Sequence, residues 1–363
     1  MTLAAHNTTQ VQYTVLPADL HQDRDAILAL WMRNLPAPGS LANQQRKFAW
    51  YYLDNPAGPG RCWLLRATPG DRVVGTAGLG KRRIYAANSS FLVGLASDFA
   101  VDHDHRLLRP ALMLQRAVTQ STADGLPMIY ALPAKQSAGA IQRVGYQSLG
   151  NTKRYVKILR IGPYLNRLVS LPRPFTAALA AIANPILRFA SSENWRRSRG
   201  YSVSEVSTFD ARFDELWNTV STAYPIIGQR TADFLRWRYT HCPLLAYHTL
   251  ALFTQSRDRL LGYAVCHLGQ NQQVTIIDLL TNNTDDAIIE LLAATVSFAR
   301  DKHAASLSLA ILDSSRFEPS LLALGFHLRL PGHPLMVFPA NATPLPATKL
   351  RNWYFTLGDE DYN

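Results

Sequence analysis

The sequence predicts a mixed α+β protein that contains two copies of one fold, joined by a basic and apolar insert. Several blocks of residues recur in the second half of the chain at a nearly constant separation, which indicates an internal duplication. Helical and strand-like periodicities also follow the same order in both halves. With 363 residues, 47% of them hydrophobic, the chain is long enough for two domains of ordinary size.

The recurring blocks contain aromatic, glycine and aspartate residues. Leu30-Trp31 matches Leu216-Trp217; Trp50, Tyr52 and Pro56 match Trp237, Tyr239 and Pro243; Val73-Val74-Gly75 matches Leu260-Leu261-Gly262; Ala77 matches Ala264; Asp98 matches Asp278; and Gly145-Tyr146 matches Gly325-Phe326. We therefore predict an N-terminal domain over 1–160, a linker over 161–200 and a C-terminal domain over 201–363.

Each copy is expected to form a mixed, mostly antiparallel sheet with one parallel crossover, flanked by helices. The apolar periodicity changes between helical and strand spacing in the same order in both copies. In chain order we expect a helix (25–33; 211–220), an aromatic-rich helix or turn (47–52; 232–239), a hairpin (62–67 with 72–79; 247–253 with 260–268), a strand leading into a helix (from 91; from 274), a strand (128–132; 306–312), a short helix ending in a Gly–aromatic step (144–146; 324–326) and a last strand (153–159; 335–338).

The strand–turn–helix stretch over 92–120 is the strongest candidate for a binding site. Its turn, 102–105, is polar and is expected to be solvated, and Arg106 and Arg109 lie in the first turn of the helix. Free N–H groups and the positive end of a helix attract phosphate, and guanidinium groups add charge and bidentate geometry. An ordinary strand–helix connection with solvated arginines also fits this pattern. The apolar positions at helical spacing are Leu108, Ala111, Leu114 and Val118.

This order of elements resembles the GNAT superfamily of acyl-CoA-dependent N-acyltransferases. Residues 101–106 (VDHDHR) are similar to the family's V-x-P-x-x-R lead into its pyrophosphate loop, with His103 in place of proline. Residues 143–146 (RVGY) and 323–326 (ALGF) are similar to the family's closing helix–Gly–aromatic step. The block 48–60 (FAWYYLDNPAGPG) and the tail 353–361 (WYFTLGDED) resemble tandem-GNAT proteins of bacterial surface-polysaccharide gene clusters.

The resemblance implies an acyl-CoA co-substrate, with acetyl-CoA as the default donor. The family loop is R/Q-x-x-G-x-G/A, but here Arg109 replaces the central glycine and Pro110 removes one N–H donor. We therefore expect a site that is present in a degenerate form. The residues placed along the cofactor are Phe99, Ala100, Val101, Arg106, Leu107, Leu108, Arg109 and Ala111.

The second copy differs at the equivalent positions. Asp285-Asp286 stands where the first copy has His105-Arg106, and Ile289 stands where it has Arg109. Two like charges about 4 Å apart cost about 4 kcal/mol at an effective dielectric constant near 20, so these acids would repel a pyrophosphate. We expect an acyl-CoA site in the first copy alone.

Amine acylation needs a base for the ammonium and a proton donor for the leaving thiolate. Asp98, within the predicted strand, is the candidate base, although a structural hydrogen-bonding role fits it equally. The family's usual leaving-group tyrosine is replaced by Ile141 in the first copy, so Tyr130 or Tyr146 would have to substitute. The aromatic block offers Trp50, Tyr52 and Asn55 as lining of an acceptor pocket; core packing is the alternative, because the two aromatic residues recur in the second copy.

The segment from 151 to 200, which includes the predicted linker, carries most of the net charge of +11. Helical spacing over 163–171 and 175–190, the latter expected to be interrupted at Asn184-Pro185, favours an anionic membrane surface as partner. A linker helix packed across the two copies is the alternative. Nucleic acid is not expected, because its binding sites interleave polar and aromatic residues with the basic ones. Between 151 and 200 one acid, Glu193, stands against ten basic residues: Lys153, Arg154, Lys157, Arg160, Arg167, Arg173, Arg188, Arg196, Arg197 and Arg199.

Patterns of other enzyme classes are absent from the sequence. It has no Ser-His-Asp, CxxC or HExxH pattern, and the three cysteines are scattered, so we expect no metal and a reducing compartment. Without a signal-like start or a long apolar run, we expect a cytoplasmic protein, peripheral at the inner face of the cell membrane. The predicted function is N-acylation of a small-molecule or glycan amine, such as a cell-envelope polysaccharide precursor. The alternative is a catalytically degenerate GNAT-fold scaffold in polysaccharide assembly. The acidic tail, Asp359 to Asp361, is expected to be solvated or to reach into a pocket.

Overall fold

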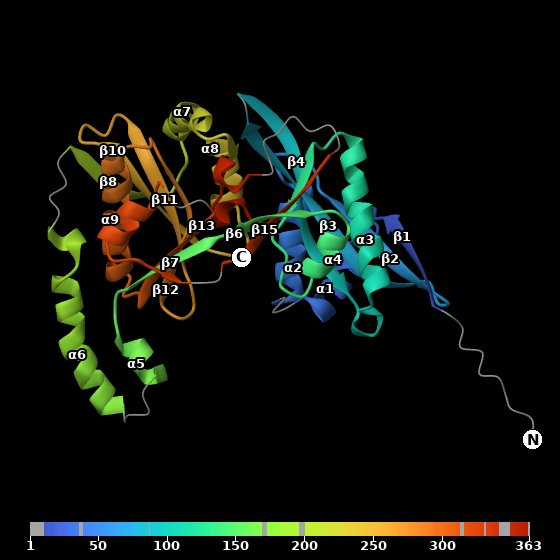
Figure 1. The fold of residues 1–363 in the computed structure, drawn as a ribbon, viewed down its shortest axis with the longest axis horizontal. Coiled ribbons are helices and arrows are strands. Elements are labelled where there is room, and N and C mark those ends of the chain that lie inside the picture. Colours follow the sequence, from blue (N-terminus) through green and yellow to red (C-terminus); the bar gives the residue numbers. More distant parts are fainter. Residues whose placement is uncertain are drawn as a thin grey trace, which may run out of the picture. The chain divides into compact units, whose positions relative to one another are not determined.

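A computed structural model describes residues 11–35, 39–86, 88–168, 173–195, 200–312, 316–329, 332–340 and 349–361 (Figure 1). The chain forms two compact units. Unit 1 comprises Met1–Arg82, Leu92–Ser148 and Met336–Pro344, and unit 2 comprises Arg83–Phe91, Leu149–Leu335 and Leu345–Asn363. Each unit therefore draws on both halves of the sequence.

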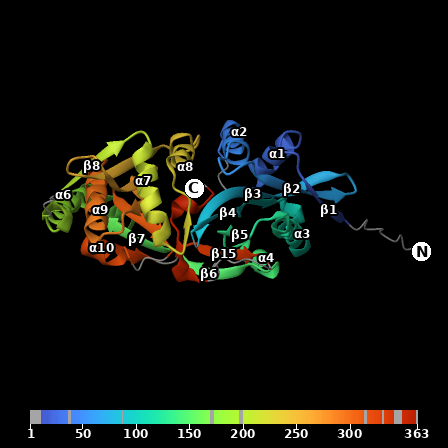
Figure 2. The ribbon, with the colours of Figure 1, turned by 90° about the horizontal axis from the view of Figure 1, so that it is seen from above.

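Unit 1 is built on a sheet with the strand order β1-β2-β3-β4-β5-β15-β6. β4 and β5 are parallel, whereas β1 with β2, β2 with β3, and β5 with β15 are antiparallel. Helices α1 and α2 lie on one face of this sheet, and α3 and α4 lie on the other (Figure 2). The bounds are β1 Gln12–Pro17, α1 Arg24–Asn34, α2 Leu41–Phe48, β2 Arg61–Thr68, β3 Arg72–Ala86, β4 Ser89–Val101, α3 Leu108–Gln120, β5 Met128–Ala131, α4 Ala138–Arg143, β6 Gln147–Asn151 and β15 Pro334–Pro339.

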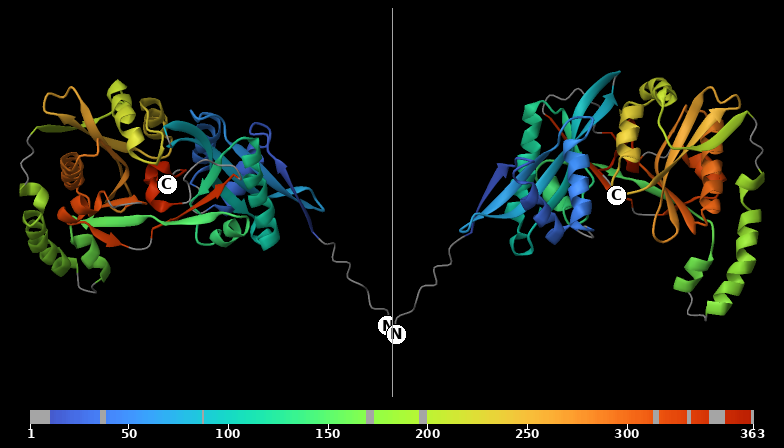
Figure 3. Two further views of the ribbon diagram at one scale, coloured as in Figure 1. Left: turned by 45° about the horizontal axis from the view of Figure 1, so that its top comes forward. Right: turned by 180° about the vertical axis from the view of Figure 1, so that it is seen from behind.

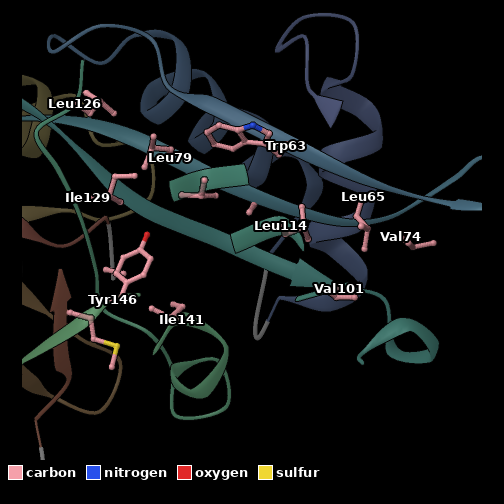
Figure 4. Close-up of a cluster of buried hydrophobic side chains, with 14 of the residues drawn as sticks. Trp63, Leu65, Val74, Leu79, Val101, Leu114, Leu126, Ile129, Ile141 and Tyr146 are labelled. Atoms are coloured by element: carbon pink, nitrogen blue, oxygen red, sulfur yellow. The ribbon is translucent and has the colours of Figure 1, made fainter. Parts of the chain in front are cut away.

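The core of unit 1 lies between this sheet and α3 (Figure 4). Leu114 and Val118, predicted at helical spacing, are fully buried against strand residues such as Leu65. Tyr146, from the Gly–aromatic step after α4, belongs to the same cluster. The apolar periodicity therefore placed this helix and its buried face correctly.

Unit 2 has a sheet with the strand order β14-β7-β13-β12-β11-β10-β8, in which β12 and β13 are parallel. A second, small ladder joins β9 in parallel to β16 and antiparallel to the tip of β3, at Ile84–Ala86. The bounds are β7 Lys153–Ile158, α5 Gly162–Leu168, α6 Arg173–Phe189, β8 Tyr201–Val206, α7 Ala211–Val220, β9 Ile226–Gly228, α8 Ala232–Leu235, β10 Tyr247–Thr254, β11 Leu260–Leu268, β12 Gln273–Thr281, α9 Asp285–Asp301, β13 Ser306–Ile311, α10 Glu318–Ala323, β14 His327–Arg329 and β16 Trp353–Tyr354.

The two sequence repeats exchange their last strands. β7 follows the first repeat but pairs with β13 of unit 2, and β15 follows the second repeat but pairs with β5 of unit 1. The prediction that each copy ends on its own last strand is therefore wrong. Both strands have six residues, and which sheet each one completes depends on pairing with distant strands, which the position of a strand in the repeat does not specify.

Both copies contain a π-helical turn at the predicted aromatic block. α2 continues into such a turn over Ala49–Leu53, and α8 continues into one over Arg236–Thr240. In each turn three consecutive residues are buried, because a π-helix rotates less per residue than an α-helix and so keeps neighbouring side chains closer to one face. The turn brings Trp50, Tyr51 and Tyr52 inward together.

Two expectations for the insert can be compared with the structure. α6 runs unbroken from Arg173 to Phe189, so the predicted interruption at Asn184-Pro185 is wrong. Pro185 is exposed and so is Ala181, whose carbonyl loses its helical partner, and water can replace that bond. Among the described helices none is long and apolar enough to cross a membrane. The last three residues of the first predicted helix, 169–171, lie outside the described residues.

Candidate functional site

Strand β4 extends beyond its parallel partner. It pairs with β5 over Gly94, Leu95 and Ala96, and then continues to Val101 without a further rung to β5 among the described residues. Asp98 lies just past this point, with φ of 49°. That conformation is uncommon for a residue other than glycine, though aspartate tolerates it better than most. The predicted cofactor residues Phe99, Ala100 and Val101 therefore lie on a strand section whose β5-side edge carries no ladder.

The first turn of α3 is open to an anion. No side chain caps this end of the helix among the described residues, and the first turn contains no acid. The N–H groups of Leu108 and Arg109 are thus available, while Pro110 contributes none. Arg109 is exposed, and Leu107 and Leu108 are 62% and 50% exposed, respectively. Ala111 donates its N–H to the carbonyl of Leu107 at 3.4 Å and begins the regular helix.

Arg106 does not extend from the helix end as the other predicted arginine does. Its Nε donates to the carbonyl of Val101 at 3.0 Å, and its Nη2 donates to Oδ1 of Asn34 at 3.2 Å. Its guanidinium therefore fastens the end of β4 to α1. Arg109 has no such tie within the described chain and remains free for a ligand.

Asp102 is held inside a cluster of donors, so its prediction as a solvated turn residue is wrong. It accepts hydrogen bonds from Asn34 at 2.6 Å and from Arg33 at 3.3 Å, and Arg72 lies 3.6 Å away. Burial raises the pKa of Asp102, but the bonds from Asn34 and Arg33 outweigh it and hold the pKa below its ordinary value. The carboxylate anchors the turn that presents α3.

Asp98, the candidate base, lies in a buried polar cluster. Its carboxylate pairs with the ammonium of Lys47, and its Oδ2 accepts the Tyr52 hydroxyl at 2.7 Å. The ammonium also lies 4.5 Å from the ring centroid of Trp31. Burial, and then the charge of Asp98, raise the pKa of Tyr52 well above its ordinary value, so Tyr52 stays protonated and donates. Sequence reasoning missed Lys47, because its spacing within α2 carries no signal for a distant strand.

Two glycines of β3 make room for this cluster. A Cβ on Gly78 would overlap the Tyr52 hydroxyl and lie 2.9 Å from its Cζ, and a Cβ on Gly80 would lie 2.5 Å from Cζ of Tyr51. The two positions alternate along the strand and so share one face. Their separation by two residues is a sequence signal for two rings packed against one face of a sheet.

The predicted acceptor residues lie in different surroundings. Tyr52 is part of the Asp98 cluster, and Trp50 is 4% exposed with its ring 6.1 Å from that of Tyr51. Asn55 donates from Nδ2 to the carbonyl of Lys81 at 3.0 Å and so holds the following loop. Their role in binding an acceptor stays a prediction.

In unit 2 the equivalent strand edge is occupied by the end of the chain. β12 pairs with β13 only as far as Ile276, and residues 353–359 follow on beside it. Thr356 forms a bridge with Ile311 and donates its hydroxyl to Asp278 at 2.9 Å, while Tyr354 bonds to the carbonyl of Leu279. The tail thus covers the positions that remain open on β4.

A buried arginine holds the tail in place. Arg230, 0% exposed, pairs with Asp278 at 3.0 Å and with Asp359 at 2.6 Å, and it also donates to Thr356 at 3.1 Å. Asp359 and Glu360 are buried, so a solvated tail, one of the two expectations, is wrong. The equivalent aspartates Asp98 and Asp278 thus take their cations from non-equivalent positions, which the repeat could not indicate.

The helix after β12 is closed to anions. Thr284 caps α9 by accepting from the N–H of Ala287, and Asp285 and Asp286 lie in its first turn. Acids at this end already satisfy the helix dipole. Within the described residues no group of three or more histidine, cysteine or acidic side chains could hold a metal ion.

No protein-family model matches this sequence, and no curated protein matches it. Solved structures do share its fold. A GCN5-related N-acetyltransferase from Kribbella flavida aligns with 93% of this chain over 73% of its own, at 14% identity and a TM-score of 0.60. The N-myristoyltransferase of Saccharomyces cerevisiae with bound myristoyl-CoA aligns with 92% of this chain over 80% of its own length, at 12% identity and a TM-score of 0.57. A tandem GNAT protein from the clavulanic acid biosynthesis pathway aligns with 90% of this chain over 98% of its own length, at 13% identity and a TM-score of 0.56. The predicted fold of two tandem GNAT-like domains is confirmed.

Proposed function

We propose that this chain, whose fold is that of tandem GCN5-related N-acetyltransferases, is an acyl-CoA-dependent N-acyltransferase with one acyl-CoA site, in unit 1. The observation that carries the proposal is the contrast between two equivalent helix ends. α3 begins uncapped beside an open strand edge, with Arg109 exposed, whereas α9 begins capped, acidic and beside an edge covered by the tail. A pyrophosphate suits the first end and is repelled by the second.

The residues of unit 1 fit the parts of an acyl-CoA. The open edge at Phe99 to Val101 offers backbone groups to the amide-bearing arm of the cofactor, as a further strand would use them. The N–H groups of Leu108 and Arg109 and the Arg109 guanidinium suit the pyrophosphate. That the yeast N-myristoyltransferase holds myristoyl-CoA in the same fold supports this placement. Acetyl-CoA is the default donor in the proposal.

The reaction would be direct transfer in a ternary complex. The amine nitrogen attacks the thioester carbonyl, the new C–N bond forms as the C–S bond breaks, and the ammonium proton passes to a base. Asp98 is the proposed base. The thiolate takes its proton from water or from Tyr146, whose buried hydroxyl has no hydrogen-bond partner among the described residues.

The proposed acceptor is an amino group on a cell-envelope polysaccharide precursor. This choice depends on the likeness of the 48–60 block and the 353–361 tail to proteins of surface-polysaccharide clusters. A screen of amino sugars and their nucleotide-linked forms, with acetyl-CoA and a thiol-detecting reagent, tests it. Turnover with simple aliphatic amines but with no amino sugar would contradict this acceptor class.

One observation favours a second candidate function, a GNAT-fold scaffold without catalysis. Pro110 removes an N–H from the loop, and Ile141 stands where the family's leaving-group tyrosine is expected. A scaffold would keep the fold and the acceptor surface but bind acyl-CoA weakly or not at all.

Calorimetry with the full-length chain separates the two functions. We expect acetyl-CoA and desulfo-CoA to bind with a stoichiometry of one. Arg109→Glu should abolish binding, whereas Asp286→Arg, the matched charge reversal in unit 2, should leave it unchanged. No binding of either ligand at millimolar concentration would exclude the enzyme and leave the scaffold. A loss of binding with Asp286→Arg would contradict the assignment to unit 1.

A further inference from the structure

Helix α6 presents its large apolar side chains to solvent. Their positions are separated by four, three, four and three residues, which places them in one stripe along the helix. Their exposed fractions run from 48% at Leu179 to 70% at Phe189. We call these residues the α6 stripe: Phe175, Leu179, Ile182, Ile186 and Phe189.

The opposite face of α6 is made of small and polar residues, and this is the face that packs against α5. Thr176 and Ala180 are buried, and a Cβ on Gly162 of α5 would lie 3.4 Å from that of Ala180. Asn184 accepts the N–H of Ile161 at 2.9 Å through its side chain. α5 and α6 lie side by side, with α6 at the outer edge of unit 2 (Figure 3). A surface helix of a globular protein normally has the reverse arrangement, with its large apolar residues inward.

The charged residues of α6 are all positive. α6 itself contains Arg173 and Arg188 and no acid. Glu193 is the single acid between 151 and 200. Its side chain is buried and pairs with Lys157 at 2.9 Å and with Arg300 at 3.0 Å, so its charge is already neutralised inside the protein. Arg188 is exposed, and the sequence from 161 to 200 offers no other acid than the buried Glu193.

We propose that the α6 stripe inserts into the surface of an anionic lipid bilayer, with α6 lying flat in the interface. A 17-residue helix is about 25 Å long, enough to lie along the interface with its stripe among the acyl chains. The flanking arginines meet the anionic headgroups, which attract basic segments within a Debye length. Phe175 and Phe189 place an aromatic ring near each end of the stripe. α6 belongs to unit 2, so this proposal does not depend on the acyl-CoA site proposed in unit 1.

Charge decides between the bilayer and a second copy of the chain. A two-fold dimer through α6 would place the same basic segment against itself, because both partners use one patch. Like charges so placed repel, whereas an anionic headgroup layer attracts the same segment. The α6 stripe and the basic residues of its segment therefore both favour an anionic lipid bilayer over a second copy of the chain.

Flotation of the full-length protein with lipid vesicles tests the proposal. We expect co-flotation with vesicles of phosphatidylserine and phosphatidylcholine in equal amounts, and little with phosphatidylcholine alone. Ile182→Asp with Ile186→Asp should weaken binding roughly 100-fold, because two large apolar side chains no longer insert. Both positions are exposed, so the fold should tolerate the changes, and circular dichroism checks this. The matched control is Leu268→Asp with Leu328→Asp, which replaces two exposed leucines on strands β11 and β14 of unit 2.

Three results would overturn the proposal. One is no flotation of the wild-type protein with either vesicle. A second is equal loss of flotation in the control pair. A third is a wild-type dimer in light scattering that Ile182→Asp with Ile186→Asp converts to a monomer, since the stripe would then be an interface between copies.

Discussion

The ammonium of Lys47 lies against the carboxylate of Asp98, and the exposed fractions of the two side chains are 0% and 2%. Removing one partner of a buried pair leaves the other charged and desolvated, which typically costs about 3–5 kcal/mol. We therefore expect Lys47→Met to lower the free energy of unfolding by about that amount in urea titrations. The control is Arg61→Met, whose pair with Asp124 is 41% and 56% exposed and should contribute at most about 1 kcal/mol. Equal effects of the two variants would contradict a desolvated pair.

Asp98→Asn distinguishes a base from a structural partner. If Asp98 is the base, kcat falls roughly 100-fold or more while acetyl-CoA affinity is kept. If the carboxylate only holds Lys47 and Tyr52, the variant loses stability and its remaining folded fraction turns over normally. Asparagine tolerates the left-handed backbone of this position, so the change removes the carboxylate charge without straining the backbone.

Gly78→Ala should destabilise unit 1 by about 1–3 kcal/mol, because its Cβ would overlap the Tyr52 hydroxyl. Gly139→Ala is the matched control: it lies in α4, its nearest neighbour would be 3.4 Å away, and alanine favours a helix. Thermal melts give both values. Combining Gly78→Ala with Tyr52→Phe should recover part of the loss, and strictly additive effects would argue against this contact.

Arg109→Ala should weaken acetyl-CoA binding about 5- to 10-fold and reduce its dependence on salt, because one exposed cation is lost from the phosphate end. Arg116→Ala removes the same charge from an exposed position farther along α3 and should change neither quantity. Titrations at two ionic strengths measure both. Identical behaviour of the two variants would mean that the first turn of α3 does not hold the pyrophosphate.

Tyr146→Phe should leave stability unchanged or raise it by up to about 1 kcal/mol, since it removes a buried hydroxyl without a partner in the described chain. The matched control, Tyr224→Phe, removes a hydroxyl that donates to Asn283 at 2.6 Å and should cost about 1 kcal/mol. If Tyr146 protonates the thiolate, kcat falls with Tyr146→Phe alone. An unchanged kcat would leave water as the proton donor.

Glu193 should make stability depend on acid pH. Burial alone would raise the pKa of Glu193, but the bonds and charges of Lys157 and Arg300 hold it below its ordinary value. A lowered folded-state pKa adds stability above about pH 4.3, and that stability is lost as the pH falls through the folded pKa. Glu193→Gln should therefore flatten the acid limb of a stability–pH curve and cost about 3 kcal/mol at neutral pH. Glu215→Gln, on the exposed side of α7, should keep the limb. If Glu193→Gln left the acid limb of the stability–pH curve unchanged, other groups would be responsible for the loss of stability at acid pH.

The sequence by itself determined the duplication, the order of the elements and the contrast between the two helix ends. These features are local: a helix shows its period within a few turns, and acids at 285 and 286 stand beside the helix start they influence. The sequence also showed that Asp98 and Asp278 are equivalent, because they occupy the same position in the two repeats.

Only the tertiary structure decided which last strand completes which sheet, which cation meets each aspartate, and where the tail and the α6 stripe lie. These outcomes depend on long-range pairing between segments whose local patterns are interchangeable. β7 and β15 stand at the same place in the two repeats but complete different sheets, and Lys47 and Arg230 reach equivalent carboxylates from non-equivalent places. The sequence of α6 is amphipathic, but it does not show which face of the helix is buried. The structure shows that the small residues face α5, which can approach them closely, and that the large apolar residues face outward.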